Sequence, residues 1–445
     1  MSRRFVFLFF LVIVLFPVYS WSQGMGNSPY SAIGIGDLLT PANVQNLGAG
    51  GLSVATYNRE FIQLSNPAAS VNKKGLYNDS LVKIEGAGTA QYKILSAPNA
   101  LETYKGANYR YFAFTVPIGK VWNTTISMQP FSVKDHSTVQ LAPAYQDGNG
   151  QIVQYTTDGK GGLYQIGLNN GWGVSKYLSL GLGLSYLFGP ANVTETAVLY
   201  TNPYTPIQPD VEHGYRRRIN HHDFGFKPSM HYRKELYKWK DSVLIPSGVF
   251  WNMGATLQIF SQMQMSVSQI DVRKSNTGTV SEDSVTTSYT RHANLPAQLT
   301  VGFSLDRPNK WMLGIEGGIA DWSRFNYGDF SNDTYRIAWN VAVGGEYRPA
   351  SRKQWKSPTY RAGINFTRLP YVISGNQLND FSASLGLTLP VGVRGTSGAA
   401  FPKINFAVVV GQRGTLSTTD IQEFYARLHV SILITDKWFI KRRIQ

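Results

Sequence analysis

The sequence predicts an all-β protein: a 14-stranded antiparallel transmembrane β-barrel with an N-terminal segment plugging its lumen. Apolar and polar residues alternate with a period of two, and long and short connections alternate between these segments. The composition combines 13% aromatic residues and 43 glycines with only 16% charged residues. These features are typical of outer-membrane barrels. We therefore expect a multi-pass protein of the bacterial cell outer membrane.

The N-terminus, residues 1–22, has the features of a signal peptide. Arg3 and Arg4 form a positive region, an apolar run follows, and Ser20 and Ser22 occupy the small-residue positions of a cleavage site. The run is shorter than the ~20 apolar residues of a membrane-spanning helix, although a short membrane anchor is the alternative. Charged or strongly polar residues interrupt every later apolar stretch, so strands are expected to cross the membrane.

The charge and the cysteine content exclude several modifications and one class of binding partner. The chain has no cysteine, which excludes a disulfide framework and a lipid-modified N-terminal cysteine. Its net charge is +15, yet the basic residues do not cluster on a helix or beside an aromatic stacking motif, so we expect no nucleic-acid partner. Cationic rims facing anionic outer-membrane lipids, including lipopolysaccharide, account better for this charge. No motif for a cofactor is present, and none is expected.

The alternation is clearest over 178–188, where apolar even positions alternate with small and polar residues such as Ser179 and Gly181. Successive side chains of a strand point to opposite faces, so the even positions are predicted to face lipid. A soluble β-sandwich also alternates, but it needs fewer and shorter strands. We predict strands over 80–92, 108–116, 122–134, 162–173, 178–189, 221–233, 249–268, 288–306, 311–324, 335–348, 358–367, 380–389, 403–412 and 422–435.

The connections support this count independently, because outer-membrane barrels alternate short periplasmic turns with longer extracellular loops. Most long gaps and short gaps alternate here, with 234–248 and 390–402 intermediate. Long gaps are predicted at 93–107, 135–161, 190–220, 269–287, 325–334, 368–379 and 413–421, and short ones at 117–121, 174–177, 307–310 and 349–357. The expected organisation is a signal peptide 1–22, a plug 23–79, a barrel 80–436 and a basic tail 437–445.

The segment before the first strand contains the stretch LGAGGLSVATYNREFIQLSNPAAS at 47–70. Its glycines let the backbone pack closely inside a barrel, and Asn66 and Pro67 favour a fixed turn. A Gly/Ala-rich stretch that ends in Asn66, Pro67 and Ala68 resembles the hatch of the FadL/TodX family of long-chain fatty acid and aromatic hydrocarbon channels. Asn-Pro-Ala alone is a common turn, so further matches are needed.

Two later regions resemble the same family. The pair LPAQLTVGFSL at 295–305 and WMLGIEGGIADWSRF at 311–325 resembles its characteristic hairpin, and YRAGINFTRLPY at 360–371 resembles one of its strands. The three matches occur in the family's order, and the resemblance is to OmpP1-like members of the Bacteroidetes type. The gaps at 190–220 and 269–287 depart from the family, because they are short and polar where its large loops form an outer groove.

The resemblance implies passive uptake of hydrophobic or amphipathic small molecules such as long-chain fatty acids. Asn66, Pro67 and Ala68 would form the gate. Substrate would leave beside a kinked wall strand, for which Pro130 is the candidate because proline removes a ladder hydrogen bond. Some members of the Bacteroidetes type serve protein secretion, so an outer-membrane scaffold or shuttle barrel with secretion partner proteins is the alternative.

Charged residues on the polar side of the alternation are predicted to point into the lumen, because charge facing lipid costs ~2–4 kcal/mol at mid-depth. Arg361 or Arg427 would bind the anionic headgroup of a ligand, since guanidinium pairs well with carboxylate. The alternative is a network of ion pairs that holds the plug. The candidates for both roles are Arg361, Arg427, Glu316, Glu346 and His429.

No enzyme is expected from this sequence. His221, His222 and Asp223 suggest a metal site, but such a site needs a third ligand and supporting hydrogen bonds, and these residues are predicted to lie at a solvated loop end. No G-x-S-x-G motif of a serine hydrolase occurs. We therefore predict neither a catalytic nor a metal site.

Overall fold

The computed structural model describes residues 27–58, 60–71, 81–98, 100–118, 121–143, 152–200, 211–240, 242–275, 286–327, 334–350, 357–391, 402–419 and 421–437. The expected signal peptide at 1–22 and all but the first residue of the basic tail at 437–445 lie outside these ranges and stay predictions.

Fourteen antiparallel strands close into a barrel, which confirms the predicted fold class. The ring closes where Gln422–Lys437 pairs with Leu81–Ser96, so the barrel leaves no sheet edge there. In order around the wall the strands are β2 (Leu81–Ala97), β3 (Ala100–Pro117), β4 (Trp122–Pro130), β7 (Tyr164–Gly173), β8 (Leu178–Tyr200), β9 (Val211–Lys240), β10 (Val243–Phe260), β13 (Gln298–Arg307), β14 (Trp311–Asp321), β15 (Ile337–Tyr347), β16 (Thr359–Ile373), β17 (Asn376–Pro390), β18 (Lys403–Arg413) and β19 (Gln422–Lys437).

The alternation sorts side chains between lipid and lumen as the sequence predicts. Leu184 and Val341 are 49% and 40% exposed on the outer face, whereas the neighbouring Gly183 and Ala342 are buried inside. Exposed apolar residues of this kind surround the wall, which is the surface that a bilayer covers in an outer-membrane barrel. Within the described ranges, no helix has the length and apolar character needed to cross a membrane.

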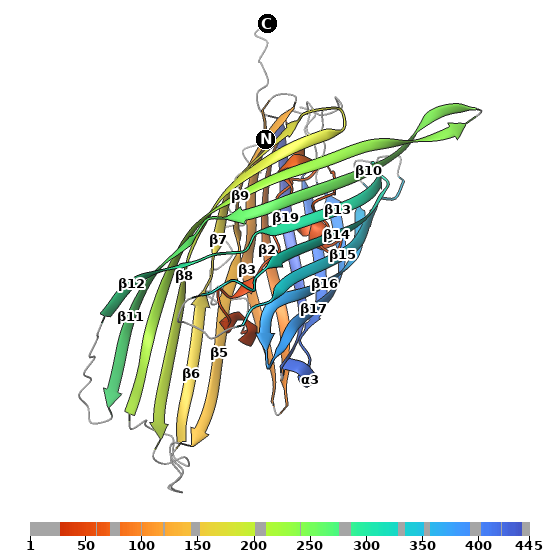
Figure 1. The fold of residues 1–445 in the computed structure, drawn as a ribbon. Helices are drawn as coiled ribbons and strands as arrows, with labels where there is room; N and C mark the ends of the chain where they lie inside the picture. Colours follow the sequence, from red (N-terminus) through yellow and green to blue (C-terminus); the bar gives the residue numbers. More distant parts are fainter. Residues whose placement is uncertain are drawn as a thin grey trace, which may run out of the picture.

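A six-stranded sheet extends from the end of the barrel that carries the longer connections (Figure 1). It joins the outer halves of β8 and β9 to β5 (Ser132–Pro143), β6 (Ile152–Gly161), β11 (Met263–Ser275) and β12 (Thr286–Ala293). The predicted connections at 135–161 and 190–220 were therefore wrong over most of their length, and the one at 269–287 was wrong at 269–275 and 286–287, the part that the structure describes. Strands continue there without the apolar alternation, because beyond the bilayer neither face has to meet lipid.

The opposite end carries the short turns, and it therefore faces the periplasm. There β9 and β10 continue past the rim as a two-stranded hairpin (Figure 1), which pairs Tyr237–Lys240 with Val243–Pro246. A register shift between Pro246 and Phe250 separates this hairpin from the wall. The predicted connection at 234–248 is thus largely strand.

The described N-terminal residues, 27–71, are mostly buried and pack against the inner side of the wall. They form η1 (Pro29–Ala32), β1 (Asp37–Leu38), α2 (Val44–Leu47) and η2 (Pro67–Ser70), and β1 pairs with β5. Two hydrophobic clusters join this segment to the wall, one around Tyr30 and Tyr371 and one around Ile62 and Tyr111. A last short helix, α3 (Leu416–Thr419), connects β18 and β19.

Candidate functional site

Asn66 fixes the turn that ends the N-terminal segment. Its side chain is fully buried, accepts a 3.0 Å hydrogen bond from the Ala68 N–H, and donates to the carbonyls of Val54 at 2.7 Å and Met230 at 3.1 Å. Pro67 begins η2, a position that proline favours because its φ is preset and its missing N–H is not needed there. The turn is therefore bonded both to its own segment and to wall strand β9.

Two wall glycines let this turn approach the barrel closely. A Cβ added at Gly171 in β7 would lie 2.3 Å from the Pro67 carbonyl oxygen. One added at Gly181 in β8 would lie 2.4 Å from the Ala68 nitrogen. Both distances are far below a van der Waals contact. Any larger residue at these positions would therefore clash with the turn and displace it from the wall.

Polar contacts attach the start of the N-terminal segment to two neighbouring strands of the wall. The Ser28 hydroxyl donates to Glu423 of β19 at 2.7 Å. Asp37 pairs with Arg413 of β18, with 2.8 Å between their oxygen and nitrogen atoms. Because hydrogen bonds involving charged groups are about twice as strong as neutral ones, these contacts hold the segment firmly.

Glu60 forms a further attachment at the periplasmic end of the segment. Its carboxylate lies 2.7 Å from Arg348 and 2.8 Å from the Lys403 ammonium. Burial alone would raise the pKa of the Glu60 carboxyl, but the nearby Lys403 and Arg348 charges outweigh it and hold the pKa below the usual range. Glu60 is therefore ionised, and the pairing joins the segment to two cations of the wall.

A cavity of about 200 Å³ lies between the N-terminal segment and the wall, and we call it the plug cavity. Apolar residues from both sides make up somewhat more than half of its lining, among them Leu38, Phe131, Leu295, Trp322 and Leu369. Polar residues make up the rest, and Lys227 and Glu316 are the charged ones. A cavity that combines apolar surface with convergent polar groups is the usual form of a small-molecule site.

The wall is interrupted beside the plug cavity. Strand β4 ends at Pro130, β5 starts at Ser132, and Phe131 between them lines the cavity. Within the described residues, the pairing of β3 with β4 stops at Phe112 and Met128, and β5 pairs with β1 of the N-terminal segment instead. Pro130 thus lies where the ladder between neighbouring wall strands ends.

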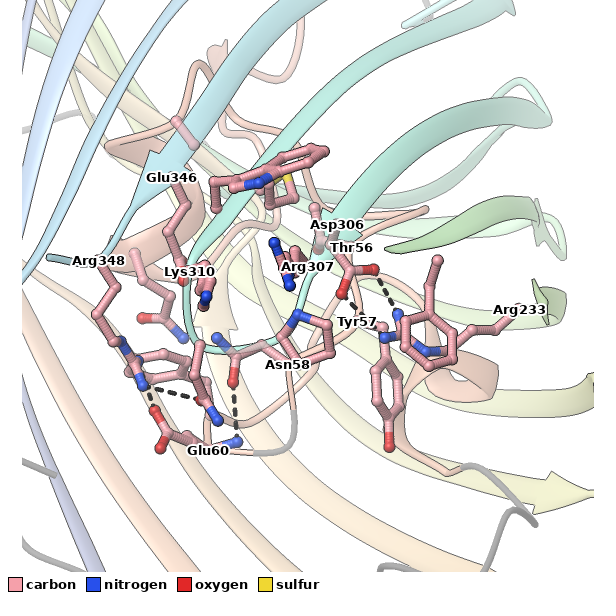
Figure 2. A pocket seen from close by; sticks show the side chains of 18 of the residues that line it. Thr56, Tyr57, Asn58, Glu60, Arg233, Asp306, Arg307, Lys310, Glu346 and Arg348 are labelled. Carbon is pink, nitrogen blue, oxygen red and sulfur yellow. Dashed lines mark hydrogen bonds and ion pairs between the residues drawn. The ribbon is translucent and has the colours of Figure 1, made fainter. Parts of the chain in front are cut away.

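A second cavity of about 380 Å³, the periplasmic vestibule, opens beneath the N-terminal segment (Figure 2). Tyr57, Asn58 and Glu60 form its inner side, and periplasmic turns containing Lys176 and Lys310 form its rim. The lining is strongly charged, in contrast to that of the plug cavity. The N-terminal segment therefore separates a cavity with two charged lining residues from one with ten.

All five charged candidates from the sequence lie on the lumen side of the wall. Glu316 accepts hydrogen bonds from the backbone N–H groups of Ser53 and Val54, both at 2.7 Å. Arg361 pairs with Glu346 at 2.7 Å, where both line the periplasmic vestibule.

The other two candidates lie apart from both cavities. Arg427 donates to Gln91 and stacks over Tyr425 at 4.0 Å, and His429 contacts the Thr89 hydroxyl at 2.7 Å. The five residues therefore do not form a single site, and binding of a ligand headgroup by Arg361 or Arg427 stays a prediction.

His221 was wrongly placed at a solvated loop end. It is fully buried within β9, and its ring Nε2 lies 2.8 Å from the Tyr327 hydroxyl. Asp223 is also buried and bonds to Ser261, whereas the His222 ring contacts Tyr186. Among the described residues, no three His, Asp or Glu side chains converge to hold a metal ion.

Several residues that attach the N-terminal segment were not predicted from the sequence, namely Ser28, Asp37, Glu60, Arg348, Arg413 and Glu423. The wall members of this set occupy lumen-facing positions, so the alternation that selected Glu316 could also have found Arg413 and Glu423. The members in the N-terminal segment have no periodic signal, because the segment contains little regular structure. Their partners could not be predicted without the register of the barrel.

Comparison with known proteins gives one family and several related folds. The model of the BamG family matches residues 1–445. No curated protein sequence matches the chain. Among solved structures, a FadL homologue of Pseudomonas aeruginosa superposes with a TM-score of 0.56 at 13% identity, covering 90% of this chain and 99% of that one.

Two hydrocarbon channels are similar to a comparable degree. The CymD monoaromatic hydrocarbon channel gives a TM-score of 0.55 at 11% identity, and the Pseudomonas putida toluene transporter TodX gives 0.51 at 11% identity. In both, 90% of this chain and 99% of the other are covered. At such low identity the similarity establishes the fold alone, and at that level the resemblance to the FadL/TodX family is confirmed.

Proposed function

We propose that this chain, which belongs to the BamG family, is an outer-membrane channel for passive uptake of small hydrophobic or amphipathic molecules. Residues 27–71 would act as its plug. The plug cavity is the observation that supports this proposal, because its lining combines apolar side chains of the N-terminal segment and of the wall next to the interruption at Pro130. A ligand in this cavity would contact the N-terminal segment, which would move as the channel opens. It would also contact the wall beside Pro130, where the ladder of interstrand hydrogen bonds is interrupted.

The route would run from the extracellular side into the plug cavity and then past Phe131. Opening this route requires that the N-terminal segment leave β5. The two are joined by the two-residue β1–β5 pairing and by further hydrogen bonds, such as those from the Leu39 N–H to the Phe131 carbonyl and from Lys134 to the Gly34 carbonyl. The turn at Asn66, Pro67 and Ala68 would serve as the gate, since it anchors the far end of the plug to β9. Long-chain fatty acids are one ligand class that fits an apolar cavity with nearby Lys227.

A variant that fills the plug cavity tests the proposal. Ala320 is buried on the lumen side of β14 and lines the cavity, so Ala320→Trp should occupy it. Ala383→Trp is the matched control, because Ala383 is exposed on the lipid-facing side of β17. We expect A320W to reduce uptake of labelled toluene and oleate into proteoliposomes about tenfold or more, since binding of an apolar ligand requires the space. Equal uptake by the two variants would refute the proposal.

A scaffold or shuttle barrel that serves protein secretion is the second candidate function. The attachments of the N-terminal segment favour it, because Ser28, Asp37, Ser53 and Glu60 bond to several separate places on the barrel and resist movement of the segment. In that case proteoliposomes with the unaltered protein would take up no hydrophobic probe. Deletion of the gene would instead reduce the amount of secreted protein.

A further inference from the structure

The periplasmic vestibule carries more positive charge than its own acidic groups can balance. Six basic and four acidic side chains line it. Three of the acids are engaged by lining arginines, in the pairs Asp306–Arg233, Glu60–Arg348 and Glu346–Arg361. By contrast, Lys176, Arg307 and Lys310 are exposed at the rim, and none has an acidic partner among the residues that the structure describes.

Aromatic side chains lie beside these cations. Tyr57, Tyr177, Phe250 and Trp311 all line the vestibule. The Arg233 guanidinium lies 4.6 Å from the Tyr57 ring centre and 4.2 Å from that of Phe250, so the inner wall is a stacked and rigid surface. The vestibule therefore offers apolar surface together with exposed positive charge, a combination that suits an amphipathic anionic ligand.

The projecting hairpin extends this apolar surface into the periplasm. Trp239 is 74% exposed, and its cross-strand partner Leu244 is 51% exposed. Tyr237, 49% exposed, occupies the next position on the same face. Alternate residues of a strand share a face, so Tyr237 and Trp239 continue the side of β9 that presents Arg233 and Glu235 to the vestibule.

Exposed aromatic residues of this kind mark an interaction surface, because a two-stranded hairpin gains little stability from leaving them in water. The surface extends beyond the vestibule, so a small molecule bound in the vestibule would not cover Trp239. An extended polypeptide can reach both parts, with acidic groups against Arg307 and Lys310 and apolar side chains against the hairpin.

We infer that the periplasmic vestibule and the β9–β10 hairpin together form a docking site for an acidic segment of a periplasmic protein that also carries apolar side chains. Exposed cations at the rim select the charge of the segment, and the hairpin binds its apolar residues. The site does not depend on whether the lumen conducts a ligand, because it lies on the periplasmic side of the plug.

Peptide binding to the full-length protein in phosphatidylcholine nanodiscs tests the inference. The probe is a fluorescein-labelled peptide of alternating Glu and Leu, and fluorescence anisotropy reports its binding. Peptides of alternating Lys and Leu and of alternating Glu and Ser test the charge and the apolar contribution separately. We expect the Glu-Leu peptide to bind in a salt-sensitive manner, the Glu-Ser peptide to bind more weakly and the Lys-Leu peptide not to bind.

Two pairs of substitutions locate the site. Arg307→Ala with Lys310→Ala should weaken binding of the Glu-Leu peptide about tenfold, the effect of losing two exposed ion pairs. Trp239→Ala with Leu244→Ala should weaken it similarly. Arg216→Ala with Arg218→Ala removes the same charge from exposed positions at the extracellular end of β9 and should leave binding unchanged.

Equal binding of the Glu-Leu and Lys-Leu peptides, or equal loss in the Arg216 and Arg218 control, would overturn the inference. So would burial of the hairpin in the bilayer. The chain has no cysteine, so a bimane label at Trp239→Cys reports that outcome alone, through quenching by a lipid-soluble quencher. A320W separates this inference from the proposed channel, because it should reduce uptake while leaving peptide binding intact.

Discussion

The carboxylate of Glu316, in the wall strand β14, accepts a 2.7 Å hydrogen bond from the backbone N–H of Ser53 in the N-terminal segment. The same carboxylate accepts the neighbouring N–H of Val54 at 2.7 Å and the Ser53 hydroxyl at 3.1 Å. A single wall side chain thus satisfies two backbone donors that would otherwise be buried without partners. Glu316 therefore attaches the N-terminal segment to the wall through three hydrogen bonds.

Replacing Glu316 by glutamine should loosen the plug. Glutamine offers a single neutral acceptor, so at least one donor loses a charge-assisted bond of ~1.5–3 kcal/mol. We expect E316Q to show more frequent or larger conductance events in planar bilayers than the unaltered protein. Glu102→Gln, at an exposed position in the extracellular half of β3, is the control and should behave like the unaltered protein. Matching currents from the two variants would show that Glu316 does not hold the plug.

The close contact between the Asn66 turn and the wall predicts that a larger residue at the contact displaces the turn. A Cβ at Gly181 would lie 2.4 Å from the Ala68 nitrogen, so Gly181→Ala should displace the turn and make the plug sensitive to protease. Gly86→Ala is the matched control, because a Cβ at Gly86 meets nothing within 4 Å. Both barrels should fold, since the ring of interstrand hydrogen bonds is unchanged. Protease resistance of G181A equal to that of G86A would contradict this close contact.

Strand positions within the bilayer could be predicted because lipid imposes alternation on them. Leu184 and Val341 were assigned to the correct face for that reason. The outer parts of β8 and β9 were missed, because residues such as Thr194 and Arg217 lie beyond the bilayer and need no apolar face. Contacts such as Asp37–Arg413 could not be predicted, since they join positions far apart in sequence through the closed barrel. The plug cavity and the periplasmic vestibule could not be predicted for the same reason, because the closed barrel brings together lining residues that are far apart in sequence.

Glu60 predicts how the plug responds to acid. Burial would raise the pKa of this carboxyl, but the Lys403 and Arg348 charges hold the pKa below its ordinary value of about 4.5. A depressed pKa in the folded state means that the ionised group stabilises the attachment at all pH values above 4.5, and that this contribution is lost only as the pH falls through the lowered value. Conductance should therefore be the same at about pH 7 and about pH 5, and should rise only in stronger acid.

Glu60→Gln removes this pH dependence and provides the control. The variant lacks the ion pairs at every pH, so its conductance should already be raised at neutral pH and should change less in strong acid. If the unaltered protein opened between neutral pH and about pH 5, another titrating group would have to control the plug.

The pair of Arg233 and Asp306 predicts a large effect on stability. The guanidinium lies 2.5 and 2.9 Å from the two carboxylate oxygens, and both residues are less than 10% exposed. Asn252 bonds to both partners at 2.7 Å. Arg233→Met leaves a buried carboxylate without its counter-ion, so the free energy of unfolding in lipid vesicles should fall by ~3–5 kcal/mol. Combining it with Asp306→Leu should restore much of this loss, because two apolar side chains can replace a buried pair at little cost. Additive losses in the double variant, measured by urea titration of tryptophan fluorescence, would show that the two residues do not act as a pair.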